Sequence, residues 1–271
     1  MKSSQSLRAT AIALLAIASI TPLSAQESRQ LSPAEQALEK AAAEQKYSFL
    51  MFYKVNDQAA KSMSQTVQQF VEAGPDRSTL IYVDVASPAE TALVKRLDVA
   101  RAPMPLVIAI APNGAVTGAT PKKVTKEQLA QSFVTPSMAQ CMKAMQSGRL
   151  ALLCAVGDGP ATLSDVAQAF AGDSQFKDRT EIVLCRVSDR AETELLKELR
   201  VERVGDVVLF APPGVLVGKF SAGASKEEVA AALHQAGKCC DDPNCKHGQA
   251  SVSPATSASR TNSQTAAPAR N

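Results

Sequence analysis

The chain has 271 residues, 45% of them hydrophobic, and a formal net charge of +3. This balance gives no electrostatic reason to bind nucleic acid or anionic lipid, so we expect neither partner. Trp is absent and only 4% of the residues are aromatic, which leaves little material for platforms that stack bases or sugars.

The N-terminus has the pattern of a secretory signal peptide. Lys2 and Arg8 precede an apolar run over residues 9–20, and residues 21–25 supply a turn and a small residue for cleavage after Ala25. The run is shorter than the roughly 20 residues that a membrane-spanning helix needs, and no later segment comes close. We therefore expect an exported protein, periplasmic or secreted, with residues 1–25 as the leader and no integral membrane segment after cleavage.

An internal repeat organises the rest of the chain. Residues 89–101 share eight identities with residues 191–203 at an offset of 102, whereas residues 111–114 return as residues 211–214 at an offset of 100. The second copy has therefore lost two residues in between. A repeat of this kind predicts a tandem duplication.

Each copy predicts alternating strands and helices. The first opens with Ser32, Pro33 and Glu35 in the positions of a capped helix start. Apolar periodicity and turn signals predict helices at residues 33–44, 62–72 and from 88, strands at 47–53, 80–85, 106–110 and 115–117, and a helix capped by Thr125. The second copy predicts strands at 150–156 and 182–187, helices at 163–170 and 189–199, a hairpin at 207–219 and a helix from Ser225.

This order of elements resembles the thioredoxin fold superfamily over nearly all of residues 32–236. The chain resembles exported bacterial proteins that carry tandem thioredoxin-like domains without Cys-x-x-Cys. The resemblance implies an α/β fold with two tandem thioredoxin-like domains, each a central mixed sheet flanked by helices. We place the domains at residues 26–135 and 136–238, followed by a Cys-rich segment at 239–247 and a disordered tail at 248–271, because the tail's polar composition cannot bury enough apolar surface.

The strongest motif of the resemblance is the stretch at residues 99–106. In thioredoxin-like proteins a cis proline there lies against the active site, so Pro105 looks like that residue and Met104-Pro105 like the cis bond. The resemblance implies a peptide-binding groove formed by Met104, Pro105, Asp57 and Gln58. The second copy has no proline at residues 204–207.

The dithiol of the family is missing from both copies. Thioredoxin-type enzymes place Cys-x-x-Cys at a helix start, but here the matching segments are residues 57–60 and 157–161, which contain no cysteine. We expect neither half to perform dithiol exchange there. Asp57 and Asp158 are expected at helix starts as caps, with a catalytic role as the alternative. With only His234 and His247 in the chain, hydrolase arrangements also lack their residues.

The six cysteines fall in two kinds of place. Cys154 and Cys185 lie in apolar strand segments, which is typical of buried and unreactive thiols. Cys141 is placed at the start of a linker helix, where we expect it to be exposed.

The remaining cysteines cluster after the last helix, at Cys239, Cys240 and Cys245, with His247 beside them. One interpretation is a disulfide from Cys239 or Cys240 to Cys245, with the left-over thiol paired with Cys141. The other is a Zn(II) or Cu(I) site made of these four side chains, although adjacent ligands are awkward for one tetrahedral ion. No other cofactor is expected.

Two hypotheses for function follow. In the first, the chain is a redox-inactive binding or scaffold module whose partner is another exported protein or peptide, paired in strand fashion beside Pro105. In the second, the Cys-rich segment handles disulfides or metal, and the two domains serve as its platform.

Overall fold

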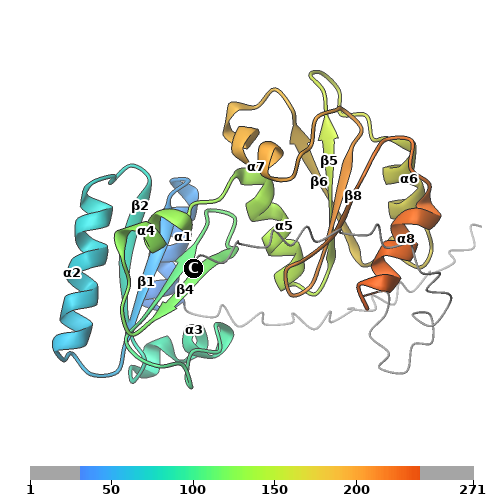
Figure 1. Ribbon diagram of the computed structural model, residues 1–271. Helices are drawn as coiled ribbons and strands as arrows, with labels where there is room; N and C mark the ends of the chain where they lie inside the picture. Colours follow the sequence, from blue (N-terminus) through green and yellow to red (C-terminus); the bar gives the residue numbers. More distant parts are fainter. Residues whose placement is uncertain (1–30, 239–271) are drawn as a thin grey trace, which may run out of the picture. The chain divides into compact units, whose positions relative to one another are not determined.

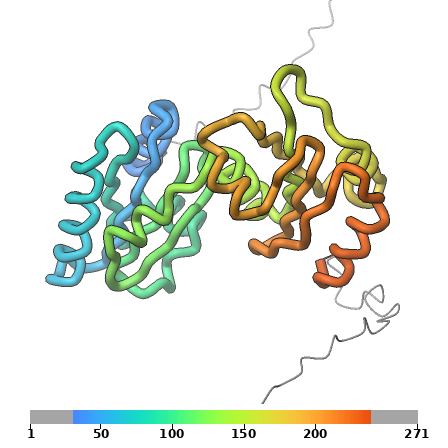
Figure 2. The backbone as a smooth tube through the Cα atoms, turned by 45° about the horizontal axis from the view of Figure 1, so that its top comes forward, coloured from blue at the N-terminus to red at the C-terminus, as the bar shows by residue number. Residues whose placement is uncertain are grey.

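The computed structural model describes residues 31–238, and in this part of the chain two four-stranded mixed sheets are each flanked by helices (Figure 1). This architecture is consistent with two thioredoxin-like domains. We call residues 32–134 the first half and residues 135–238 the second half, and each half is one continuous stretch of chain (Figure 2). The expected leader, Cys-rich segment and tail lie outside the described residues.

The first half follows the expected order of strand, helix, strand, helix, hairpin and helix. Its strand order is β2-β1-β3-β4, with β1 and β2 parallel and the other neighbours antiparallel. The elements are α1 (Pro33–Ala43), β1 (Tyr47–Tyr53), α2 (Gln58–Glu72), β2 (Ser78–Asp84), the short 3-10 helix η1 (Pro88–Glu90), α3 (Thr91–Arg96), β3 (Leu106–Ile110), β4 (Val116–Pro121) and α4 (Lys126–Gln131).

The second half repeats this topology with the strand order β6-β5-β7-β8. Its elements are α5 (Pro136–Gln146), β5 (Leu150–Val156), α6 (Asp165–Gly172), β6 (Thr180–Arg186), η2 (Arg190–Glu192), α7 (Thr193–Glu198), β7 (Val207–Ala211), β8 (Val215–Phe220) and α8 (Lys226–Gln235). Both halves therefore have the same architecture, in the order of elements that the resemblance implies.

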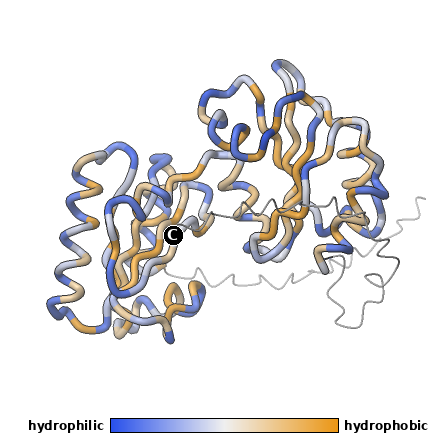
Figure 3. Tube along the Cα trace, in the orientation of Figure 1, coloured by the Kyte–Doolittle hydropathy of each residue, from blue (hydrophilic) through white to orange (hydrophobic). Residues whose placement is uncertain are grey.

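Each sheet buries both of its faces, which explains the unbroken apolar runs of its central strands (Figure 3). In β1, Leu50 and Phe52 pack in the core of one face, which α1 and α3 cover. Phe49 and Met51 point to the opposite face, toward α2 and α4. In the second half the cores of the two faces lie in the same way under α5 and α7, and under α6 and α8.

Short-range capping fixes several helix starts as the sequence predicts. The side chains of Ser32, Thr125 and Ser225 each accept a hydrogen bond from the backbone N–H three residues later, and the side chain at that later position accepts one from the backbone N–H of the cap. This reciprocal pairing satisfies backbone donors that a helix start otherwise leaves free.

A buried glutamate fastens the first helix of each half. The Glu90 carboxylate, on η1, accepts from the Ser32 hydroxyl at 2.6 Å and from the Ala34 N–H at 3.1 Å. Its equivalent Glu192, on η2, accepts from the Ser137 N–H at 2.8 Å. Both side chains are nearly inaccessible, and a carboxylate is well placed at a helix N-terminus, where the helix dipole is positive.

The element boundaries differ from the sequence prediction mainly where residues are exposed. α2 begins at Gln58 and not near Ser62, because its polar first turn shows no apolar period and its start is set by the Asp57 cap. The segments expected as single helices from residues 88 and 189 each begin as a 3-10 turn. β4 runs beyond the expected 115–117 to Pro121. None of the helices within residues 31–238 is long and apolar enough to cross a membrane.

Candidate functional site

The first-half candidate site lies where β1 ends and β3 begins. Phe52 pairs with Leu106, so the loop after β1 and the residues before β3 reach the same end of the sheet. That end holds Asp57, Gln58, Met104 and Pro105, the four residues predicted to form the groove. No hydrogen bond or ion pair links Asp57 or Gln58 to Met104 within the described residues.

Asp57 has a structural role at this end. It is the N-cap of α2, and its carboxylate accepts a hydrogen bond from the Ala60 N–H at 2.9 Å. The capping interpretation of Asp57 is confirmed. Gln58, the first residue of α2, is exposed.

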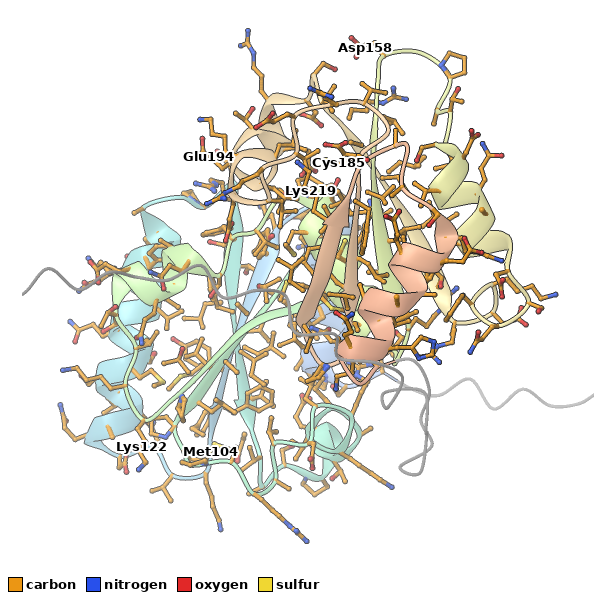
Figure 4. All side chains as sticks on the ribbon, turned by 45° about the vertical axis from the view of Figure 1, so that its right-hand side comes forward. Met104, Lys122, Asp158, Cys185, Glu194 and Lys219 are labelled. Atoms are coloured by element: carbon orange, nitrogen blue, oxygen red, sulfur yellow. The ribbon has the colours of Figure 1, made fainter. Side chains whose placement is uncertain are left out.

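The Met104–Pro105 peptide bond is cis, as the resemblance implies. The Pro105 carbonyl oxygen accepts from the Lys122 N–H at 2.7 Å, so the turn after β4 lies against this loop. Figure 4 shows Met104 and Lys122 at the same end of the sheet. By contrast, neither the N–H nor the carbonyl of Met104 has a hydrogen-bond partner among residues 31–238.

A pocket of about 370 Å³ opens beside the loop after β1. It lies between α2 and the outer strand β2, and Lys61 is the one charged side chain among the residues that line it. On its rim, the hydroxyl groups of Ser64 and Tyr82 are hydrogen bonded at 2.7 Å. Val55, in the loop leading to the pocket, is 66% exposed. The sequence prediction did not single out these residues.

The second half closes the corresponding place with its own backbone. Met51 and Cys154 are the fifth residues of β1 and β5, and they pair with Val107 and Val207. Val107 and Val207 are therefore equivalent, and the residues two positions before them, Pro105 and Gly205, are equivalent as well. The Gly205 N–H donates to the Ala155 carbonyl at 2.8 Å. Gly205 has φ +92°, and a Cβ there would lie 2.8 Å from the Ala222 Cβ, so only glycine fits.

Side chains also fasten the loop after β5. Arg186 Nη1 donates to the carbonyl oxygens of Gly157 at 3.0 Å and Gly159 at 3.1 Å. The Ser188 hydroxyl donates to the Asp158 carboxylate. Asp158 was expected to cap a helix, and that prediction is wrong. α6 begins seven residues later, at Asp165, because Gly157, Gly159 and Pro160 extend the loop.

An ion pair completes the closure of the second half. Asp206 occupies the position of the apolar Leu106, and its side chain is 6% exposed. Lys219 Nζ lies 3.3 Å from the Asp206 carboxylate and also donates to the Arg200 carbonyl. The equivalent residue in the first half is Ala119, which carries no charge.

The three described cysteines all lie in the second half and all are buried. Burial raises the pKa of Cys141 and of Cys154 to about 12, and that of Cys185 to about 11. The core prediction for Cys154 and Cys185 is confirmed. The prediction that Cys141 is exposed at a helix start is wrong: it lies in the middle of α5 on the face that packs against the sheet.

Within residues 31–238, neither candidate loop carries a thiol and no cluster of metal-binding side chains occurs. The segments at residues 54–61 and 157–164 contain no sulfur. Residues 31–238 contain no group of three or more His, Cys, Asp or Glu side chains that could hold a metal ion. The predicted disulfide or metal residues Cys239, Cys240, Cys245 and His247 lie outside the described residues.

No protein-family model matches the chain, and a search of curated proteins gives no match. Among solved structures, similar ones include thioredoxin O2 from Arabidopsis thaliana, with 19% identity over 35% of this chain and 78% of that one, and a TM-score of 0.29. StoA from Bacillus subtilis is 18% identical over 32% of this chain and 82% of that one, with a TM-score of 0.26. A disulphide isomerase from Xylella fastidiosa is 15% identical over 35% and 80%, with a TM-score of 0.29.

Proposed function

We propose that the chain is an exported, redox-inactive binding module whose first half holds an extended peptide of another exported protein beside Met104 and Pro105. The observation that carries this proposal is the Met104 backbone, whose N–H and carbonyl are both left without a partner among residues 31–238. An extended peptide has both an acceptor and a donor to offer, so it satisfies the two groups at once.

The neighbourhood of Met104 supports a short strand-like contact. Pro105 has no N–H, so the loop makes no further backbone donation at that residue. On the other side, the Lys122 N–H is already used by the Pro105 carbonyl. The Met104 N–H and carbonyl are therefore among the backbone groups of this loop that have no partner within residues 31–238, and the exposed Val55 offers an apolar contact nearby.

The absence of sulfur at the site supports the redox-inactive part of the proposal. Dithiol exchange needs a thiolate at the start of the helix, and residues 57–61 provide a carboxylate, amide, methyl and ammonium groups. The buried thiols of the second half do not substitute, because their raised pKa keeps them protonated at neutral pH. Export rests on the leader pattern at residues 1–25.

The test is peptide selection on the full chain followed by affinity measurement on backbone variants. A displayed random-peptide library is panned against the wild type, and selected peptides are measured by calorimetry. Met104→Pro removes the N–H donor, whereas Met104→Ala keeps the backbone and trims the side chain. We expect M104P to abolish measurable binding and M104A to retain most of it.

The second half supplies the matched control. Val204 precedes Gly205 as Met104 precedes Pro105, so Val204→Pro makes the same change at the equivalent position and should leave peptide binding unaffected. If M104P does not fold, the amide NMR shifts of Met104 and Lys122 on addition of peptide to the wild type decide the matter. Peptides that bind without moving these two signals, or no selected peptide at all, would refute the proposal.

A further inference from the structure

Exposed basic side chains surround the Met104–Pro105 end of the first half. They come from the loop after β1, the first turn of α2, the segment before β3 and the turn after β4: Lys54, Lys61, Arg101, Lys122 and Lys123. None of the five has an ion-pair partner within residues 31–238. Asp57 and Asp84, which follow the first strand and end the second, accept hydrogen bonds from the backbone N–H groups of Ala60 and Ala86.

The second half shows that the fold itself does not require this charge. Lys122 and Lys123 correspond to Ala222 and Gly223, since β4 and β8 pair with β3 and β7 in the same register. Lys54 corresponds to Gly157, the residue after β5. The stretch at 160–164, which matches the surroundings of Lys61, carries no charge, and only Arg101 keeps a basic equivalent, Arg203.

One of these cations, Lys61, lines the pocket beside the loop after β1. Lys61 lines the pocket together with neutral amide and hydroxyl side chains, including Asn56 and Gln65. These groups hydrogen bond to a carboxylate, and Lys61 supplies the opposite charge. The pocket volume of about 370 Å³ is ample for one acidic side chain.

We infer that the peptide held beside Met104 is acidic, with one carboxylate side chain in the Lys61 pocket and others facing Lys122 and Lys123. This inference rests on the proposed function and adds the chemical class of the ligand. The Met104 carbonyl, which has no partner among residues 31–238, favours a polypeptide over a nucleic acid, because a phosphodiester backbone accepts hydrogen bonds but has no donor to offer that carbonyl.

The size of the charge effect follows from the exposure of the lysines. Ion pairs between exposed side chains contribute up to about 1 kcal/mol each, which is about a fivefold change in affinity. Such contributions are screened over a Debye length of about 10 Å at 0.1 M salt. Acidic peptides should therefore bind more weakly as salt is added, while neutral peptides should not.

The probes are three fluorescent peptides of about six residues, an ordinary strand length, with valine alternating with Glu, Gln or Lys. Their binding to the full chain is measured by fluorescence anisotropy at low and high salt. We expect the order Glu, Gln, Lys in affinity, with a difference of about tenfold between the first two.

Two variants with the same change in charge locate the effect. K122A/K123G gives the first half the residues of the second half and removes two positive charges; it should weaken the Glu peptide about tenfold. A222E/G223E changes the charge by the same amount at the equivalent place in the second half and should leave affinity within about twofold.

The possible outcomes separate the two proposals. Equal binding of all three peptides that still depends on the Met104 N–H overturns the acidic preference and leaves the proposed function standing. Failure of every peptide, including those from the library, overturns both. Binding of a single-stranded oligonucleotide as tightly as the Glu peptide, with the same loss in K122A/K123G, overturns the assignment of a peptide ligand.

Discussion

The two halves share a strand order but differ at the end of the sheet where the first strand ends and the third begins. In the second half, Gly205 donates to Ala155, Arg186 fastens the loop after β5, and Asp206 pairs with Lys219. In the first half, Met104 keeps its backbone groups unpaired among residues 31–238. The same topology thus carries a loop whose backbone groups are paired and one whose backbone groups are not, so a few loop residues set the difference between the two halves.

The largest expected effect concerns the thiols, which among the described residues occur only in the second half. In a variant with Cys239, Cys240 and Cys245 changed to Ser, we expect a thiol reagent to label Cys141, Cys154 and Cys185 at least about a thousandfold more slowly in native than in denatured protein, because labelling requires unfolding. The measurement is labelling rate against pH.

Raising the pH from 8 to 9 should speed the native reaction by the same factor as that of free cysteine, because labelling takes place in the unfolded chain. A direct reaction in the fold, where burial raises the pKa of Cys141 to about 12, would instead rise by the full factor of about ten. Free cysteine under the same conditions is the control. Labelling of the native variant at the rate of free cysteine would show that this half opens far more readily than its packing indicates.

The next largest effect concerns the ion pair between Lys219 and Asp206, which stand where the first half has apolar residues. Lys219→Ala leaves the buried Asp206 carboxylate without its cation, and we expect a loss of about 2 kcal/mol in the free energy of unfolding, reduced because Lys219 is partly exposed. Denaturant unfolding curves of the full chain provide the measurement.

The double variant D206L/K219A installs the residues that the first half has at these positions, Leu106 and Ala119. It should recover most of the lost stability, since an apolar pair often replaces a buried ion pair without loss. A double variant as unstable as K219A would mean that the surrounding residues of the second half do not pack against a leucine and an alanine at these two positions.

The smallest expected effect is a pH-dependent one at a partly exposed ion pair of the second half. Asp173 and Lys226 lie 2.8 Å apart, and the hydrogen bond between them lowers the pKa of Asp173 and raises that of Lys226. The first half has Ala73 in place of Asp173, so its Lys126 lacks this partner. We expect Asp173→Ala to lower the melting temperature slightly at pH 7.

The pH dependence has a definite sign. A lowered pKa of Asp173 stabilises the fold above its ordinary value of 3.8, and this contribution is lost as the pH falls through the lower folded value. A raised pKa of Lys226 stabilises the fold below 10.5, and this is lost as the pH rises through the higher folded value. The difference in melting temperature between D173A and wild type should vanish in strong acid. A difference that persists there would assign the effect to packing.

The central strands were well predicted because each is marked by an apolar run in its own sequence. Residues 47–53, 106–110 and 150–156 are apolar runs, and the structure places a strand at each of these three ranges. Helix starts with a capping box, such as those at Ser32 and Ser225, were equally readable. The edge strand β4 was underestimated because its mixed, partly exposed residues, including Gly118, carry no clear period.

The candidate site was predictable in position but not in detail. The resemblance located Met104 and Pro105, yet the partners that close the second half join residues far apart in the chain, such as Arg186 with Gly157. The sequence around either residue contains no pattern that predicts such a contact. The misplaced Cys141 has a simpler cause: the helix was begun too late, which hid that its buried face includes this residue. The basic residues around Met104 were visible in a comparison of the two copies.

The buried glutamates Glu90 and Glu192 have a consequence for how the chain can be divided. Each ties the opening turn of a helix to a 3-10 turn more than fifty residues later in the same half. The contacts of Glu90 therefore lie wholly before the junction between Val134 and Thr135, and the contact of Glu192 lies wholly after it. A linker inserted at that junction separates no donor from its acceptor in either set of hydrogen bonds. The same holds for a fusion that exchanges one half for a relative, because each glutamate stays on one segment with the groups that it binds.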